Sequence, residues 1–180
     1  MSPRLPYFAS QVHTGALLEQ LAAWRGTRWQ HAGARPNVMK CGIHGDCLFW
    51  VPLFKSIGAL PAQLKIPDYR LREALADEMQ TLRSKIVATG RAQLIWERDG
   101  VSHFRGKSDN ALQGLGLPWL IVGDVLLFKN GTSGAHCGLL VKAAPIHFAH
   151  LTGNGLNEEP LHQTHYVASL NYVYRLLEES

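Results

Sequence analysis

The sequence contains little cysteine: its three cysteines, Cys41, Cys47 and Cys137, are an odd number spread over 180 residues. This count argues against a small domain built on a disulfide framework and leaves at least one thiol free. A chain of this length can bury most of its apolar surface without disulfides or metal ions. We therefore expect one domain over residues 1–180.

Long apolar runs are also missing. The longest, Trp119–Phe128, is interrupted by Gly123 and Asp124 and is too short to cross a bilayer. Residues 1–10 contain two prolines and no apolar run, unlike a signal peptide. We expect a chain that is synthesised in the cytoplasm without a signal peptide and without membrane insertion, and that needs another export route to act outside the cell.

Dense basic runs, internal repeats and low-complexity linkers are missing as well. The formal charge is +4, but the lysines and arginines are scattered and follow no RNA-recognition motif or zinc-finger spacing. This pattern argues against nucleic acid as a partner. A mildly basic surface would suit an anionic partner such as a bacterial cell wall.

Two helices are indicated by apolar residues at helical spacing. The first is expected over Thr14–Arg25, where Thr14 can cap the start and Gly26 can close the end. The second, an amphipathic helix from Asp68 to Gly90, falls within a stretch at about 62–117 that we interpret as a helical insertion.

The apolar segment Cys47–Ile57 predicts a third, buried helix with Asp46 at its N-cap. Pro52 would fall past the first turn of that helix and is expected to kink it. A buried strand is the competing interpretation.

The second half of the chain predicts strands separated by turn residues. Helices first and strands second indicate an α+β domain, with a helical N-terminal half packed on an antiparallel, partly barrel-like sheet. The expected strands are Leu120–Phe128, His136–Lys142, Ile146–Leu151 and Leu170–Leu177.

Cys47 is the first candidate for chemistry. A cysteine at a helix N-terminus lies where backbone N–H groups and the helix dipole stabilise its thiolate, although a free cysteine is more often a small buried apolar residue. His136 opens a strand after a glycine-rich loop and could reach a thiol from another element. Cys137 should point to the opposite face of that strand and pack in the core.

Five segments, in order, resemble motifs of the NlpC/P60 family of cell-wall peptidases, particularly its phage-tail and phage-like members. Cys47 would lie in the nucleophile motif, His136 would open the base motif, and His150 would occupy the place of the third catalytic polar group. The segments are Gly26–Gly33, Gly45–Val51, Val122–Phe128, His136–Leu140 and Phe148–His150.

The resemblance implies a papain-like fold and a thiol protease or amidase that cleaves amide bonds in peptidoglycan stem peptides through an acyl-enzyme, without a metal or organic cofactor. It implies Cys47 as nucleophile, His136 as base and His150 as the group that orients it. The motif residues expected to contact the substrate are Trp29, His31 and Asp46. Delivery on a phage tail or by a secretion system would bring such an enzyme to the periplasm or cell wall.

Several alternatives stay open from the residues alone. Cys41 is a rival nucleophile, and His147 is a rival to His150 on the other face of the same strand. Cys41, His44 and Cys47 could also form half of a zinc site, which would make the chain a zinc-binding or non-catalytic interaction module. The same fold could instead serve an acyltransferase or a deamidase.

Overall fold

The structure is a computed structural model. The structure describes residues 4–29, 43–44, 49–64, 87, 90–98, 115–129 and 135–179. Of residues 29, 43, 44, 129 and 135, only the backbone is described.

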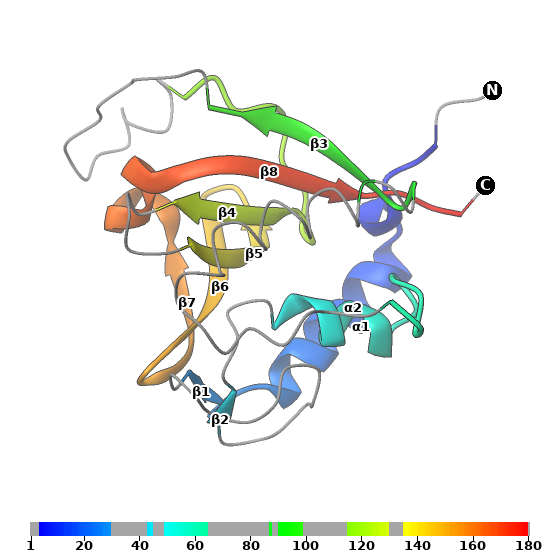
Figure 1. Cartoon of the computed structure of the whole chain (residues 1–180), viewed down its shortest axis with the longest axis horizontal. Coiled ribbons are helices and arrows are strands. Elements are labelled where there is room, and N and C mark those ends of the chain that lie inside the picture. The colour runs from blue at the N-terminus through cyan, green and yellow to red at the C-terminus, as the bar shows by residue number, and fades with distance from the viewer. Residues whose placement is uncertain are drawn as a thin grey trace.

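The described residues form a mixed fold of helices and a six-stranded antiparallel sheet (Figure 1). The sheet has the strand order β3-β8-β4-β5-β6-β7, and β1 and β2 form a separate parallel pair. The α-helices are α1 (Gln11–Ala23) and α2 (Trp50–Ser56), and short 3-10 helices are η1 (Tyr7–Ala9), η2 (Leu161–Gln163) and η3 (His165–Ser169). The strands are β1 (Arg28–Trp29), β2 (Ile43–His44), β3 (Ala92–Glu97), β4 (Val125–Lys129), β5 (Ala135–Ala143), β6 (Ile146–Thr152), β7 (Gly155–Pro160) and β8 (Leu170–Leu176).

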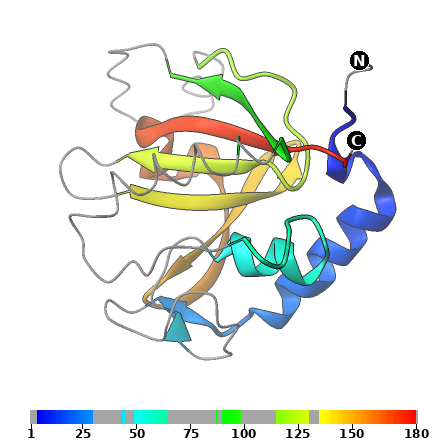
Figure 2. The same ribbon diagram turned by 45° about the vertical axis from the view of Figure 1, so that its right-hand side comes forward.

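The sheet carries a different apolar layer on each face. Both α-helices pack on one face, as Figure 2 shows from the side, and alternate residues of the strands meet them there, including Cys137 and Leu139 of β5. The opposite face packs on η2 and η3, with Phe128 and Phe148 in that layer. The α+β class expected from the sequence is therefore confirmed, and Cys137 packs in the core as expected.

Helix α1 begins earlier than the sequence predicted. It starts at Gln11, and Ser10, not Thr14, is the residue before it. The Thr14 hydroxyl donates a hydrogen bond to the carbonyl of Phe8 at 2.9 Å, which ties the helix to η1 and leaves no capping role for Thr14. Gly26 does follow the helix end, with a φ of +83° that favours glycine.

Helix α2 confirms the helical interpretation over part of the predicted range. It begins at Trp50, so Pro52 lies in the first turn, where backbone N–H groups have no intrahelical acceptor and proline costs little. The kink at Pro52 was expected because the helix was predicted to begin at Cys47, which would have placed Pro52 beyond the first turn. Cys47 and its expected cap Asp46 lie outside the described residues.

The strand predicted to begin at Leu120 begins five residues later. Strand β4 begins at Val125, because Gly123 takes a φ of +92° and the Ile121 N–H donates to the Asp124 carboxylate at 2.9 Å, which closes a turn. The same carboxylate pairs with Arg175 of β8 at 2.7–2.8 Å while almost fully buried. Burial raises the pKa of Asp124, and the hydrogen bonds from the Arg175 guanidinium oppose that rise.

The sequence did not predict β3 and β7, which are the two edges of the sheet. An edge strand needs fewer apolar residues than a central one, and β7 (Gly-Leu-Asn-Glu-Glu-Pro) shows no apolar alternation. Strand β3 falls inside the stretch at 62–117 interpreted as a helical insertion, yet it pairs with β8 in the main sheet. The Asp68–Gly90 helix lies almost entirely outside the described residues.

The chain ends meet beside the helical layer. Pro6 forms a bridge with Leu177, and the Glu178 N–H donates to the carbonyl of Leu5 at 3.0 Å. Figure 1 shows both termini on the same side of the molecule. Within the described part of the chain, none of the helices has the length and apolar character to cross a membrane.

Candidate functional site

Three polar side chains form a hydrogen-bonded row on the face of the sheet that packs on η2 and η3. The Nε2 atom of His136 lies 2.9 Å from Nδ1 of His150, and Nε2 of His150 lies 2.9 Å from a carboxylate oxygen of Glu159. His150 is buried to 1% exposure, whereas the Glu159 side chain is 38% exposed. We refer to His136, His150 and Glu159 as the relay.

Strand register brings the relay together from three neighbouring strands. Leu139 of β5 pairs with Ala149 of β6, so His136 and His150 are diagonal neighbours on one face. His150 pairs with Asn157 of β7, which makes Glu159 its diagonal neighbour on the other side. Long polar side chains can span such diagonals. Strand pairing thus brings His150 into contact with His136, 14 positions earlier in the chain, and with Glu159, 9 positions later.

Aromatic rings enclose the two imidazoles. The Tyr166 ring of η3 stacks on His136 with centroids 4.8 Å apart and planes 18° from parallel, and it meets His150 edge-on at 5.1 Å. The Phe148 ring stacks on His150 at 4.7 Å, and Phe128 lies 6.1 Å from His136. These contacts hold both rings in fixed orientations and exclude water from their faces.

The buried setting keeps both histidines neutral at physiological pH. Burial, together with the nearby His150 and His165, lowers the pKa of His136 from 6.5 to about 3. Burial also lowers the pKa of His150, while its hydrogen bond to Glu159 acts in the opposite direction. A neutral imidazole can accept a proton, and a neighbouring anion would raise its pKa towards the range of a working base.

The stability of the fold is therefore expected to depend on His136 in acid. The unfolded chain binds a proton at His136 near pH 6.5 and the folded chain only near pH 3, so the free energy of unfolding should fall as pH falls between these values. The slope for this residue is at most about 1.4 kcal/mol per pH unit. Urea denaturation across this interval should show a shallower pH dependence in His136→Gln than in wild type or His147→Gln. Equal slopes in all three would contradict the assignment.

Gly138 provides the space on which this arrangement depends. A Cβ atom at Gly138 would lie 2.4 Å from Cδ2 of Phe148, the ring on which His150 stacks. Gly138→Ala should therefore displace Phe148, destabilise the fold by about 1–3 kcal/mol and disturb the relay. Thermal unfolding is the measurement, with Gly153→Ala as control, because a Cβ at Gly153 meets nothing within 4 Å. Equal melting temperatures in the two variants would refute this.

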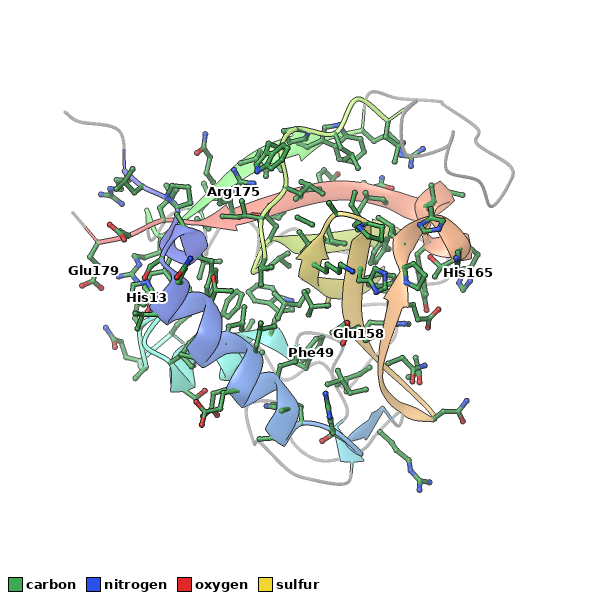
Figure 3. The ribbon with its side chains drawn as sticks, turned by 180° about the vertical axis from the view of Figure 1, so that it is seen from behind. His13, Phe49, Glu158, His165, Arg175 and Glu179 are labelled. Carbon is green, nitrogen blue, oxygen red and sulfur yellow. The ribbon has the colours of Figure 1, made fainter. Side chains whose placement is uncertain are left out.

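Of the two histidines weighed on β6, the structure brings His150 to His136. His147 is on the other side of the strand, where its Nδ1 lies 4.0 Å from a carboxylate oxygen of Glu158. In Figure 3, Glu158 and His165 lie on opposite sides of the β6–β7 ribbon. The His147–Glu158 pair thus repeats the residue types of the relay without contact to His136.

The other predicted site residues lie in β1 or outside the described residues. Trp29 is in β1, paired with His44 of β2, and only its backbone is described. His31, Asp46, Cys47 and the rival Cys41 lie outside the described residues.

Glu159 and Tyr166 were not identified from the sequence. Glu159 lies nine residues after His150, and no motif marks it. A usable signal would have been strand alternation in Gly155–Pro160, which places Leu156 and Glu158 on one face and Asn157 and Glu159 on the other.

No family model and no curated protein matches this chain. The resemblance to the NlpC/P60 family therefore rests on the five motifs alone. In the part of the chain that the structure describes, no group of three or more histidine, cysteine, aspartate or glutamate side chains is arranged to hold a metal ion.

Proposed function

We propose that this chain is a papain-like cysteine hydrolase of the NlpC/P60 type, with Cys47 as nucleophile and His136 as its base. The observation that carries the proposal is the 2.9 Å contact between His136 and the buried His150. A cysteine hydrolase needs a base whose second ring nitrogen is held by a polar group, and this contact supplies that arrangement.

The described neighbours of Cys47 support its approach to His136. Strand β2 ends at His44, and β1, its partner, lies beside β6 and β7. Figure 1 shows β1 and β2 near the turn that joins those strands. His136 is the second residue of β5, at the same end of the sheet. Strand β2 therefore ends, three residues before Cys47, near the end of the sheet where His136 lies.

The direction of that approach is restricted. Helix α2, which follows Cys47, packs on the face of the sheet that holds Cys137, and Figure 3 shows Phe49 between α1 and the sheet. The relay lies on the other face. A thiol from Cys47 must accordingly reach His136 around the start of β5, not through the sheet.

The proposed reaction has two steps. His136 takes the proton of the Cys47 thiol, and the thiolate attacks an amide carbonyl. The imidazolium then protonates the leaving amine as the C–N bond breaks, which leaves a thioester. Water, deprotonated by His136, attacks that thioester, and the acid is released as the thiol regains its proton. The negative thiolate would raise the low pKa of His136 and make this proton transfer favourable.

The proposed substrate is the stem peptide of peptidoglycan, on the strength of the five family-like motifs. A phage tail or a secretion system would then be the delivery partner, and Trp29, His31 and Asp46 would contact the peptide.

The test is digestion of purified peptidoglycan followed by mass spectrometry of the released muropeptides. Hydrolysis of a stem-peptide amide that resists a chelator is the expected result. Loss of activity with the chelator would favour the zinc-dependent alternative. Transfer of the acyl group to an added amine without hydrolysis would favour the acyltransferase, and ammonia release from a side-chain amide the deamidase.

A further inference from the structure

Glu159 is the outer member of the relay, and it has a chemical property that the two histidines lack. A carboxylate can only accept hydrogen bonds, whereas a neutral imidazole has one nitrogen that donates and one that accepts. A row of two neutral imidazoles can therefore run in either direction, and the group at its end decides which.

Counting protons along the relay gives one direction. Glu159 accepts, so Nε2 of the neutral His150 carries the hydrogen and donates at 2.9 Å. Nδ1 of His150 is then a bare acceptor, and Nε2 of His136 donates to it, also at 2.9 Å. The only nitrogen of His136 left without a hydrogen is Nδ1, which can take a proton from a thiol.

We propose that Glu159 is a positioning residue that fixes the tautomers of both histidines and so keeps Nδ1 of His136 as the basic nitrogen. In the reversed relay, the lone pair of His150 Nε2 would face the carboxylate oxygen at hydrogen-bond distance, with no hydrogen between them. His136 would then carry its hydrogen on Nδ1 and could not act as a base there. The kinetic consequence of this inference rests on the proposed function, but the tautomers do not.

Glu159→Gln is the variant that separates this role from a merely structural one. Glutamine has the same shape, but its amide can accept from His150 Nε2 or donate to it, so both directions of the relay become possible. Glu158→Gln is the matched control, because it makes the same change one residue away in the pair with His147.

The measurement is long-range ¹H–¹⁵N NMR of the full chain with ¹⁵N-labelled histidine at neutral pH, which reports which ring nitrogen carries the hydrogen. In wild type and Glu158→Gln, both relay histidines should carry it on Nε2. In Glu159→Gln, a share of His136 should carry it on Nδ1, and kcat on peptidoglycan should fall on the order of 10–10²-fold with little change in KM.

Two results would overturn the inference: a wild-type His136 with its hydrogen on Nδ1, or tautomers that stay the same in Glu159→Gln. The wild-type spectrum alone decides the first, even if the variant does not fold. The expected tautomers in a protein that hydrolyses no peptidoglycan would support the positioning role of Glu159 and overturn only the proposed function.

Discussion

Cys47→Ala should lose nearly all hydrolysis of peptidoglycan, a fall in kcat on the order of 10⁴–10⁶-fold, because the proposed nucleophile that forms the thioester is removed. Rates would be followed by mass spectrometry of the muropeptides, with circular dichroism to check the fold.

Iodoacetamide at neutral pH should label Cys47 faster than Cys41 or Cys137, since a thiolate reacts and a buried thiol does not. Cys137 is fully buried among core residues.

Cys41→Ala is the matched control for Cys47→Ala. It removes a thiol six positions earlier and is expected to leave the rate unchanged. An inactive Cys41→Ala beside an active Cys47→Ala would move the nucleophile to Cys41. Full activity in both variants would show that neither Cys47 nor Cys41 is the required nucleophile.

His136→Ala is expected to show the second largest loss, on the order of 10²–10⁴-fold in kcat, because acid–base catalysis disappears while the thiol remains. Its ring is held between Tyr166, Phe128 and His150, so alanine also leaves a gap among them. His136→Gln fills more of that gap but cannot act as a base, so it should be as slow as His136→Ala. A His136→Gln variant with wild-type kcat would remove the base assignment.

His150 and His147 provide the contrast within one strand. His150 only orients the ring of His136, and an amide can accept the same hydrogen bond, so His150→Asn should keep substantial activity. His147→Ala should have no effect, because that side chain pairs with Glu158 on the other face of the sheet. An inactive His147→Ala beside an active His150→Ala would show that the relay is not the catalytic group.

Much of the fold followed from local pattern. The apolar segment that ends at Gly58 predicted α2, and the turn residues of the second half predicted β5, β6 and β8 to within a few residues. The edge strands β3 and β7 could not be found in this way, because an edge needs no continuous apolar pattern. The start of β4 depended on the Asp124 carboxylate and its contacts with Ile121 and Arg175, which a local pattern does not encode.

For the candidate site, the order of residues along each strand was enough to assign side chains to the two faces of the sheet. Side chains alternate along a strand, so the order His136-Cys137 fixes that one points to the core beneath the helices and the other away from it. The same rule separates His147 from His150.

The contacts between the relay residues depend on how the strands pair in the folded chain. Which residue of β6 lies diagonal to His136 depends on strand register, and the register shifts between Leu140 and Lys142 of β5. The place of Glu159 at the end of the relay depends on the pairing of β6 with β7, an edge strand whose sequence does not show which strand it pairs with. Pairing between strands is set by packing over the whole sheet, so a chain of hydrogen bonds that crosses three strands exists only in the folded protein.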